Sequence, residues 1–177
     1  MKIIKEMYGL DLNSLIIQWA KERDLVKREN ATKQYFKLIE EKGELFGAIL
    51  KNDKVGIIDA IGDIQVVKII LCSQFDVIYK TDDEKTFENA DAFNKALLTA
   101  ELDNLMLMYN EVVSEFLIVE NGIVKDLKRD YLIASLLVLE QIGQRLNLTL
   151  EECLTSAYQE IKDRKGKTIN GSFVKAE

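Results

Sequence analysis

Hydrophobic residues recur along this chain at intervals of three and four positions, the spacing that gathers them on one face of an α-helix. Leu12, Leu15, Ile16 and Trp19 follow this spacing in the first segment, and later segments repeat it. The pattern predicts an all-α fold, a bundle of about five to six helices with a short basic C-terminal arm. The predicted helices run from Leu12 to Asp24, Ala31 to Lys51, Val55 to Tyr79, Phe87 to Val119 and Leu127 to Leu146, and a sixth starts at Thr149.

Some features of this pattern indicate how the helices are arranged. The segment from Val55 to Tyr79 is apolar on nearly every side, so we expect it at the centre of the fold. A short connection around Asn52 separates it from the preceding helix, so these two helices should lie antiparallel. Thr149, with Glu152 three positions later, forms a capping box that marks the start of the last helix.

The end of the chain is basic and contains glycine. Lysines and an arginine precede the pair Asn170-Gly171, which is typical of a tight turn. Residues 165–177 are therefore expected to form a short hairpin or a flexible basic arm. Because no repeat or low-complexity linker interrupts the sequence, we expect a single helical domain over residues 1–177.

The composition narrows the possible chemistry. The chain has no proline, which fits long uninterrupted helices, and no histidine. The lack of histidine excludes Ser-His-Asp and Cys-His nucleophile systems and zinc sites that use histidine. Cys72 and Cys153 are too few for a soft-metal site, are not expected to form a disulfide, and fit a reducing cytoplasm. Any metal ion should therefore have oxygen ligands, which favours Mg²⁺, Mn²⁺ or Ca²⁺.

The charge of the chain bears on its partners. A formal net charge of −6 is unfavourable for a nucleic-acid partner, which would require a basic face. It leaves room for a small phosphorylated ligand held through metal ions. The most apolar stretch, Gly56 to Leu71, contains Asp59, Asp63 and Lys68, so we expect no membrane span. Together with the absence of a signal-peptide pattern, this predicts a cytoplasmic protein.

Two adjacent predicted helices carry acidic residues at helical spacing. Glu41 and Glu44 lie three positions apart on one helix, and Asp59 and Asp63 lie four apart on the next. The second helix has little polar surface, so carboxylates buried there need cations. One interpretation is a divalent metal ion shared by all four acids. The other is that a Lys or Arg elsewhere in the chain pairs with them.

Other polar residues near these acids also allow two interpretations. Gln34 and Lys37 extend the stripe of Glu41 along its helix, and such a stripe is commonly only the solvated side. Trp19 either belongs to the apolar core or stacks on a ligand. The basic tail either follows a helix C-terminus, where positive charge is favourable, or clamps phosphate groups.

Longer motifs are more specific. Gln34-x-x-Lys-Leu-Ile-Glu-Glu-Lys-Gly-Glu-Leu is followed by Asp59-Ala-Ile-Gly-Asp-Ile-Gln-Val-Val, and the chain ends with Leu150-Glu-Glu-Cys-Leu and Asn170-Gly-Ser-Phe-Val-Lys. With Trp19 and Arg23, these stretches resemble the MazG-like branch of the all-α nucleoside triphosphate pyrophosphohydrolases, particularly its phage-encoded members. The resemblance covers about the first eighty residues and the last thirty. Residues between about 74 and 128 carry no motif of this kind.

The resemblance implies hydrolysis of a (deoxy)nucleoside triphosphate to monophosphate and pyrophosphate, in control of the nucleotide pool, by a homodimer or tetramer with Mg²⁺ or Mn²⁺. The family pattern is Glu-x-x-Glu followed on the next helix by Glu-x-x-Asp. Here Ala60 replaces the second pair's Glu, and Asp59 is expected to take its place. The expected site residues are Glu41, Glu44, Asp59 and Asp63 for metal, and Trp19, Gln34, Lys37, Arg164, Lys165, Lys167 and Asn170 for substrate. Because the chain has no histidine, a carboxylate must take the proton, and Glu40, beside the metal ligands, is the expected catalytic base.

A second hypothesis belongs to a different class. The chain could keep this fold without turnover, as a helical interaction or assembly protein whose acids serve solubility or a structural ion. Release of pyrophosphate from a panel of nucleotides would separate the two.

Overall fold

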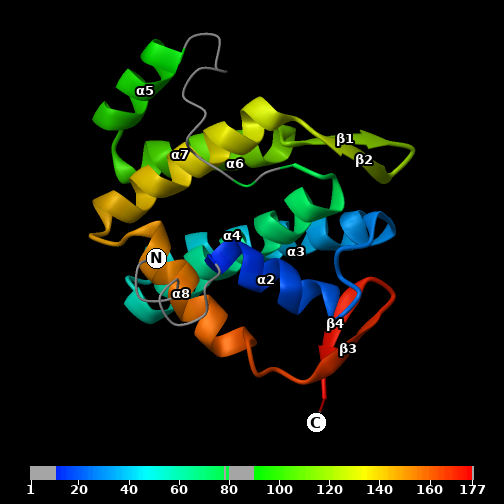
Figure 1. Cartoon of the computed structure of the whole chain (residues 1–177). Coiled ribbons are helices and arrows are strands. Elements are labelled where there is room, and N and C mark those ends of the chain that lie inside the picture. Colours follow the sequence, from blue (N-terminus) through cyan, green and yellow to red (C-terminus); the bar gives the residue numbers. More distant parts are fainter. Residues whose placement is uncertain (1–10, 78, 80–89, 177) are drawn as a thin grey trace. The chain divides into compact units, whose positions relative to one another are not determined.

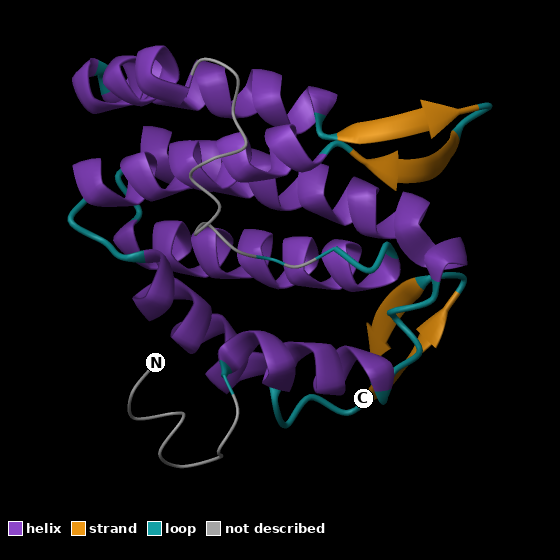
Figure 2. Cartoon of the chain, turned by 45° about the horizontal axis from the view of Figure 1, so that its top comes forward, coloured by secondary structure: helices purple, strands orange, loops and turns teal. Residues whose placement is uncertain are grey.

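The computed structural model describes residues 11–77, 79 and 90–176. It is mostly helical with two small strand pairs, which confirms the predicted helical character (Figure 2). Contacts divide the chain into two compact units: the described residues up to Tyr79 together with those from Glu151, and the residues between them. In chain order the elements of the first unit are α2 (Leu12–Lys21), η1 (Arg28–Asn30), α3 (Ala31–Leu50), α4 (Lys54–Gln74), α8 (Leu150–Ile161), β3 (Gly166–Ile169) and β4 (Ser172–Lys175) (Figure 1).

Helix α4 lies at the centre of the first unit. It is buried on most of its sides, as its all-round apolar sequence predicts. The turn from α3 uses Asn52 in a left-handed conformation, with φ of 53°. Asp53 then caps α4 by accepting a hydrogen bond from the Gly56 N–H at 3.1 Å. This short turn makes α3 and α4 antiparallel neighbours.

Helix α8 lies directly on α4 because of one glycine. A Cβ atom at Gly62 would lie 2.5 Å from the carbonyl oxygen of Cys153 and 2.8 Å from the Cβ of Ala157. Only glycine permits this approach of two helix backbones. Helices α2, α4 and α8 enclose a shared core that consists of Leu12, Leu15, Ile16, Trp19, Ala20, Leu25, Val66, Ile69, Ile70, Leu154, Ala157, Tyr158 and Ile161.

The C-terminal segment forms a hairpin, β3–β4, so the flexible basic arm is not confirmed. Asn170 and Gly171 form its turn with φ of 50° and 80°, the conformation expected of an Asn-Gly pair. Gly171 is buried, and a Cβ atom there would lie 2.9 Å from Oδ1 of Asn30.

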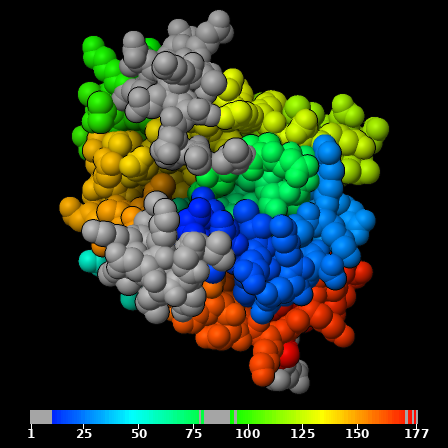
Figure 3. Space-filling model, in the orientation of Figure 1, coloured from blue at the N-terminus to red at the C-terminus, as the bar shows by residue number. Residues whose placement is uncertain are grey.

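Arg23 connects this hairpin to α2. Its guanidinium donates a hydrogen bond of 2.6 Å to the Arg164 carbonyl oxygen, and the Thr168 hydroxyl donates to the Arg23 carbonyl oxygen. In the space-filling view the red atoms of the hairpin lie against blue atoms that follow α2 (Figure 3). The tail is thus a packed part of the first unit.

The second unit contains α5 (Ala90–Thr99), α6 (Leu102–Glu115), β1 (Leu117–Glu120), β2 (Ile123–Leu127) and α7 (Arg129–Arg145). The prediction of one helix from Phe87 to Val119 is wrong over its described part, from Ala90 onward, and its start at Phe87 lies outside the described residues. The Thr99 hydroxyl donates to the carbonyl oxygens of Lys95 and Ala96, and Glu101 is extended, so α5 ends there.

The same predicted helix also ends too late. Beyond Glu115 the chain forms β1, where Ile118 and Val119 favour extended backbone. Asn121 and Gly122 have φ of 51° and 74° and turn the chain into β2. The predicted turn is therefore confirmed, but it joins two strands rather than two helices.

The remaining helices begin within about two residues of their predicted starts, and α8 begins directly after Thr149. Two of them end earlier than predicted: α2 at Lys21 rather than Asp24, and α4 at Gln74 rather than Tyr79. Cys72 and Cys153 are both buried and free, so no disulfide joins them. Among the helices of the described residues, none combines the length and apolar character that crossing a membrane requires.

Candidate functional site

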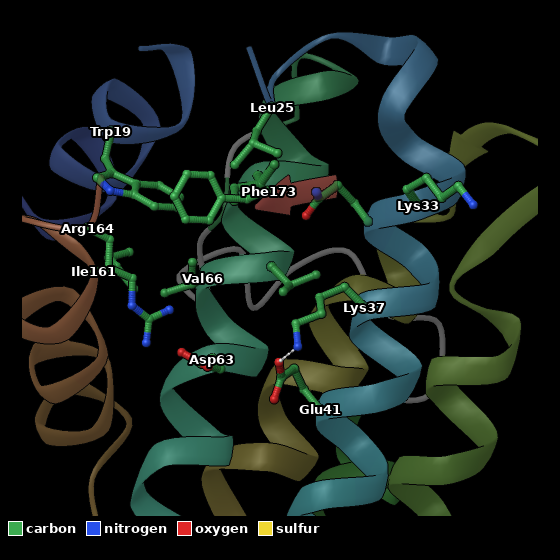
Figure 4. A pocket seen from close by; sticks show the side chains of 13 residues that line it. Trp19, Leu25, Lys33, Lys37, Glu41, Asp63, Val66, Ile161, Arg164 and Phe173 are labelled. Atoms are coloured by element: carbon green, nitrogen blue, oxygen red, sulfur yellow. Dashed lines mark ion pairs between the residues drawn. The ribbon is translucent and has the colours of Figure 1, made fainter. Parts of the chain in front are cut away.

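A cavity of about 320 Å³ opens in the first unit between α2, α3, α4 and the C-terminal segment (Figure 4). Helical spacing on α3 and α4 brings several polar side chains to its wall. Six residues singled out from the sequence line it: Trp19, Gln34, Lys37, Glu41, Asp63 and Arg164.

The two ends of the cavity differ in chemistry. Because α3 and α4 run antiparallel, Glu41 and Asp63 lie together at one end (Figure 4). Trp19, Leu25 and Phe173 lie together at the other. The cavity thus has a charged end and an apolar end.

Glu41 is the most deeply buried acid of the site, with 1% of its surface exposed. Its Oε1 lies 2.6 Å from the ammonium nitrogen of Lys37, which also lies 3.0 Å from Oε2 of Glu40. Burial raises the pKa of Glu41 to about 7, and Asp63 and Glu44 act in the same direction, whereas Lys37 opposes them. Burial therefore outweighs the ion pair with Lys37 in setting the pKa of this carboxyl group.

Asp63 has a similar environment. Burial raises the pKa of its carboxyl group, and Asp59 and Glu44 add to this effect. Arg164 and Lys37 lower it, so both basic residues lie within electrostatic reach of Asp63. The charged end of the cavity therefore combines carboxylates with Lys37 and Arg164.

The other sequence-predicted acids line a neighbouring depression of about 440 Å³, here called the acidic hollow and formed around Glu40, Glu44 and Asp59. Asp59 is exposed to solvent. The expectation that burial forces a cation on Asp59 is therefore wrong, because this residue lies near the open N-terminal end of α4. Glu40 is exposed too and contacts Lys37.

The four predicted metal ligands are thus divided between two adjoining depressions. Among the residues that the structure describes, no three acidic or cysteine side chains lie close enough together to hold a metal ion as they stand. Their chemistry nevertheless fits a hard divalent ion, because all four are carboxylates that interact electrostatically across α3 and α4. Holding an ion at Glu41 would require Lys37 to move away from it.

The apolar end of the cavity has an aromatic wall. The rings of Trp19 and Phe173 lie 5.5 Å apart at an interplanar angle of 60°. The guanidinium carbon of Arg23 lies 4.6 Å from the Trp19 ring and 5.8 Å from the Phe173 ring. Trp19 therefore belongs to the core and to the cavity wall at once.

The basic tail divides into two groups. Arg164 lines the cavity and pairs with Glu160 on α8. Lys165, Lys167 and Asn170 are exposed on or beside the hairpin and are not part of the cavity wall. Of the predicted tail residues, the structure places only Arg164 at the site.

Sequence reasoning missed part of the wall. Leu25, Lys33 and Phe173 line the cavity without having been predicted. Phe173 follows the Asn-Gly turn by two positions, and a docked hairpin would have brought its ring to α2. Nothing in the local sequence distinguished Leu25 or Lys33 from ordinary core and surface residues.

Comparison with known proteins gives one partial similarity. No protein-family model matches the chain, and no solved structure matches it significantly. A stretch of 67 residues is 46% identical to an uncharacterised 18.2 kDa protein from the rep-hol intergenic region of Haemophilus phage HP1. The match covers 36% of this chain and 41% of the phage protein, so it is a similarity over less than half of either.

Proposed function

We propose that this chain is a Mg²⁺- or Mn²⁺-dependent nucleoside triphosphate pyrophosphohydrolase with a MazG-like bundle architecture. The observation that carries the proposal is the cavity itself. It places the buried Glu41 and the half-buried Asp63 beside Lys37 and Arg164 at one end and aromatic rings at the other. A cytoplasmic homodimer or tetramer that controls the nucleotide pool is part of the same proposal.

The charged end suits a phosphate chain held with a metal ion. Glu41 and Asp63 would repel a phosphate group if no cation lay between them. A bound metal ion would remove this repulsion, while Lys37 and Arg164 attract the phosphate directly. Glu41 and Asp63, with Glu44 and Asp59 from the acidic hollow, are the residues that would hold the ion. When bound, it would neutralise phosphate charge and orient the attacking water.

The remaining residues supply positioning and proton transfer. Lys37 and Arg164 are close enough to Asp63 to bind phosphate oxygens at the charged end. Glu40 is exposed beside Lys37, so it can accept a proton from water. The Trp19 and Phe173 rings close the apolar end and exclude water there.

One observation favours the alternative of a helical interaction protein without turnover. Lys37 already neutralises Glu41 through a 2.6 Å ion pair, so the buried acid has a cation within the protein. In that case the cavity would need neither metal nor substrate.

Product analysis with purified chain, Mg²⁺ and a panel of ribo- and deoxyribonucleoside triphosphates tests the proposal. We expect pyrophosphate and nucleoside monophosphate, and loss of both products in excess chelator. Orthophosphate as the sole product, or turnover that persists in chelator, would contradict the proposal. Absence of turnover with every nucleotide would support the interaction protein.

Two neighbouring isosteric substitutions assign the roles of the acids. Glu40→Gln should lower kcat by at least about 100-fold without changing Mn²⁺ affinity, because it removes only the proton acceptor. Glu41→Gln should weaken Mn²⁺ binding in calorimetry by at least about tenfold, because it removes a ligand. Glu111→Gln, on an exposed position of α6, serves as control and should change neither.

A further inference from the structure

Gln34 is a buried polar residue that the proposed mechanism does not use. Its side chain lines the cavity with only 6% of the residue exposed. No side-chain hydrogen bond joins its amide to another described residue, and its amide atoms are not among the fully buried side-chain atoms that lack a partner. The amide therefore reaches the cavity, where it is available to hydrogen-bond a ligand.

The position of Gln34 along α3 separates it from the charged end. It precedes Glu41 by seven residues, and Ile70 follows Asp63 by seven residues on the antiparallel helix. Seven residues correspond to about 10 Å along a helix axis. Gln34 and Ile70 therefore share the level of the apolar end, about 10 Å from the two carboxylates.

Most of the wall at this level is apolar, and Lys33, next to Gln34 on α3, is its charged residue. Leu25, Val67 and Ile70 are buried aliphatic side chains, and Trp19 and Phe173 add aromatic faces. The Trp19 Nε1 atom is itself completely buried and has no partner among the described residues. This buried atom offers a ligand no hydrogen bond, so Gln34 is the buried side chain of the cavity wall that can supply one at this end.

A nucleobase matches this environment. Its faces are apolar and its edge presents neighbouring donors and acceptors, which a side-chain amide can pair with because it offers both an N–H donor and a C=O acceptor. From the geometry we infer that the apolar end is a base subsite and that Gln34 reads the hydrogen-bonding edge of the base. This inference rests on the proposed nucleotide substrate and assigns the residue that selects among bases.

The test uses ligands that cannot be hydrolysed, so that binding is separated from turnover. Dissociation constants are measured by calorimetry with Mg²⁺ for α,β-methylene triphosphates of the four common nucleosides, and for inorganic triphosphate, which has no base. Wild type should prefer one base. Gln34→Met should weaken that nucleotide by about tenfold and bring the four bases within about threefold, while inorganic triphosphate stays within about twofold.

Two further variants make the outcome specific. Gln34→Glu keeps an acceptor and removes the amide donor, so it should change the order of base preference rather than abolish binding. Gln159→Met, at an exposed position of α8, is the matched control and should bind like wild type. Circular dichroism of every variant checks that the helices are intact.

Several results would overturn the inference. Equal weakening of nucleotides and inorganic triphosphate would place Gln34 at the phosphates, and unchanged affinities would remove it from the site. A wild-type chain without base preference would also refute it, even if pyrophosphate is released. Conversely, Gln34-dependent base preference in a chain that never releases pyrophosphate would support the base subsite and refute only the proposed hydrolysis.

Discussion

Lys68 shows at the residue scale how burial alone creates a pH dependence of stability. This lysine is completely buried in α4, and burial lowers the pKa of its ammonium group to about 7, with the nearby Cys72 acting in the opposite direction. Below pH 7 both the folded and the unfolded chain hold this proton. Between pH 7 and 9 only the unfolded chain does, so the free energy of unfolding should rise with pH.

Comparison with Lys68→Met isolates this contribution. Between pH 7 and 9 wild type should gain on the order of 2 kcal/mol in free energy of unfolding relative to the variant, because one proton is linked to unfolding in this window. Urea unfolding at pH 6, 7, 8 and 9 measures the difference. Curves for the two proteins that stay parallel over the whole range would show that Lys68 does not titrate there.

Individual site residues were predictable where helical spacing alone determines position. Glu41 and Asp63 meet in the cavity because both lie on regular helices joined by a short turn. The burial of Asp59 was wrongly expected, because apolar neighbours in sequence do not show which part of a helix is covered by other elements. Phe173 could not be found, since its contact with Trp19 depends on a distant segment.

At the scale of elements, two helical glycines differ in whether their surroundings leave space for a Cβ atom. A Cβ atom at Gly62 would clash with backbone and side-chain atoms of α8, whereas a Cβ atom at Gly43 on α3 would meet nothing within 4 Å. Where there is space for its Cβ atom, alanine stabilises a helix by about 0.5–1 kcal/mol relative to glycine at the same position. The two positions therefore form a matched pair.

We expect Gly43→Ala to stabilise the protein by about 0.5–1 kcal/mol and Gly62→Ala to destabilise it by about 1–3 kcal/mol. The loss at Gly62 follows because the Cys153 backbone cannot give way as a flexible side chain could. Thermal unfolding of both variants provides the measurement. Stabilisation by Gly62→Ala would mean that α8 does not lie against α4 at this distance.

Regular helices were predictable at this scale, and interruptions were not. The bounds of α3 and α7 follow the hydrophobic spacing to within one or two residues. The break at Glu101 depends on extended backbone and on hydroxyl bonds from Thr99, which the same spacing does not reveal. The strand pair β1–β2 was missed because Leu117 to Val119 also continue a helical pattern.

At the scale of the whole molecule, the C-terminal hairpin matters for stability as well as for the cavity. Phe173 packs against Trp19, whereas the adjacent Val174 is exposed. Phe173→Ala should lower the free energy of unfolding by about 1–2 kcal/mol, less than for a fully buried ring, and Val174→Ala should leave it within about 0.5 kcal/mol.

Trp19 provides a direct measurement, because it is the only tryptophan in the chain. Its fluorescence should shift to longer wavelength in folded Phe173→Ala, which opens one side of the indole ring to water, and remain unchanged in Val174→Ala. If both variants had the same spectrum and the same stability, the hairpin would not be packed against Trp19. The C-terminal segment would then be the flexible arm that the sequence also allowed.

Local sequence could not decide between hairpin and arm. The Asn170-Gly171 pair predicts a turn in either case, and the residues that contact the C-terminal segment, Trp19 and Arg23, lie near the other end of the sequence. Arg23 contacts Arg164 and Thr168 across separations of 141 and 145 positions. No helical or strand periodicity reports contacts over such a distance.

This separation has a kinetic consequence. Contacts between residues so far apart form only after a long loop has closed, which is unfavourable in entropy and slow. Docking of the hairpin on α2 is therefore expected after the transition state for folding, so that Phe173→Ala should accelerate unfolding while leaving the folding rate nearly unchanged. A ligand that bridges Trp19 and Phe173 would then prolong the lifetime of the native state.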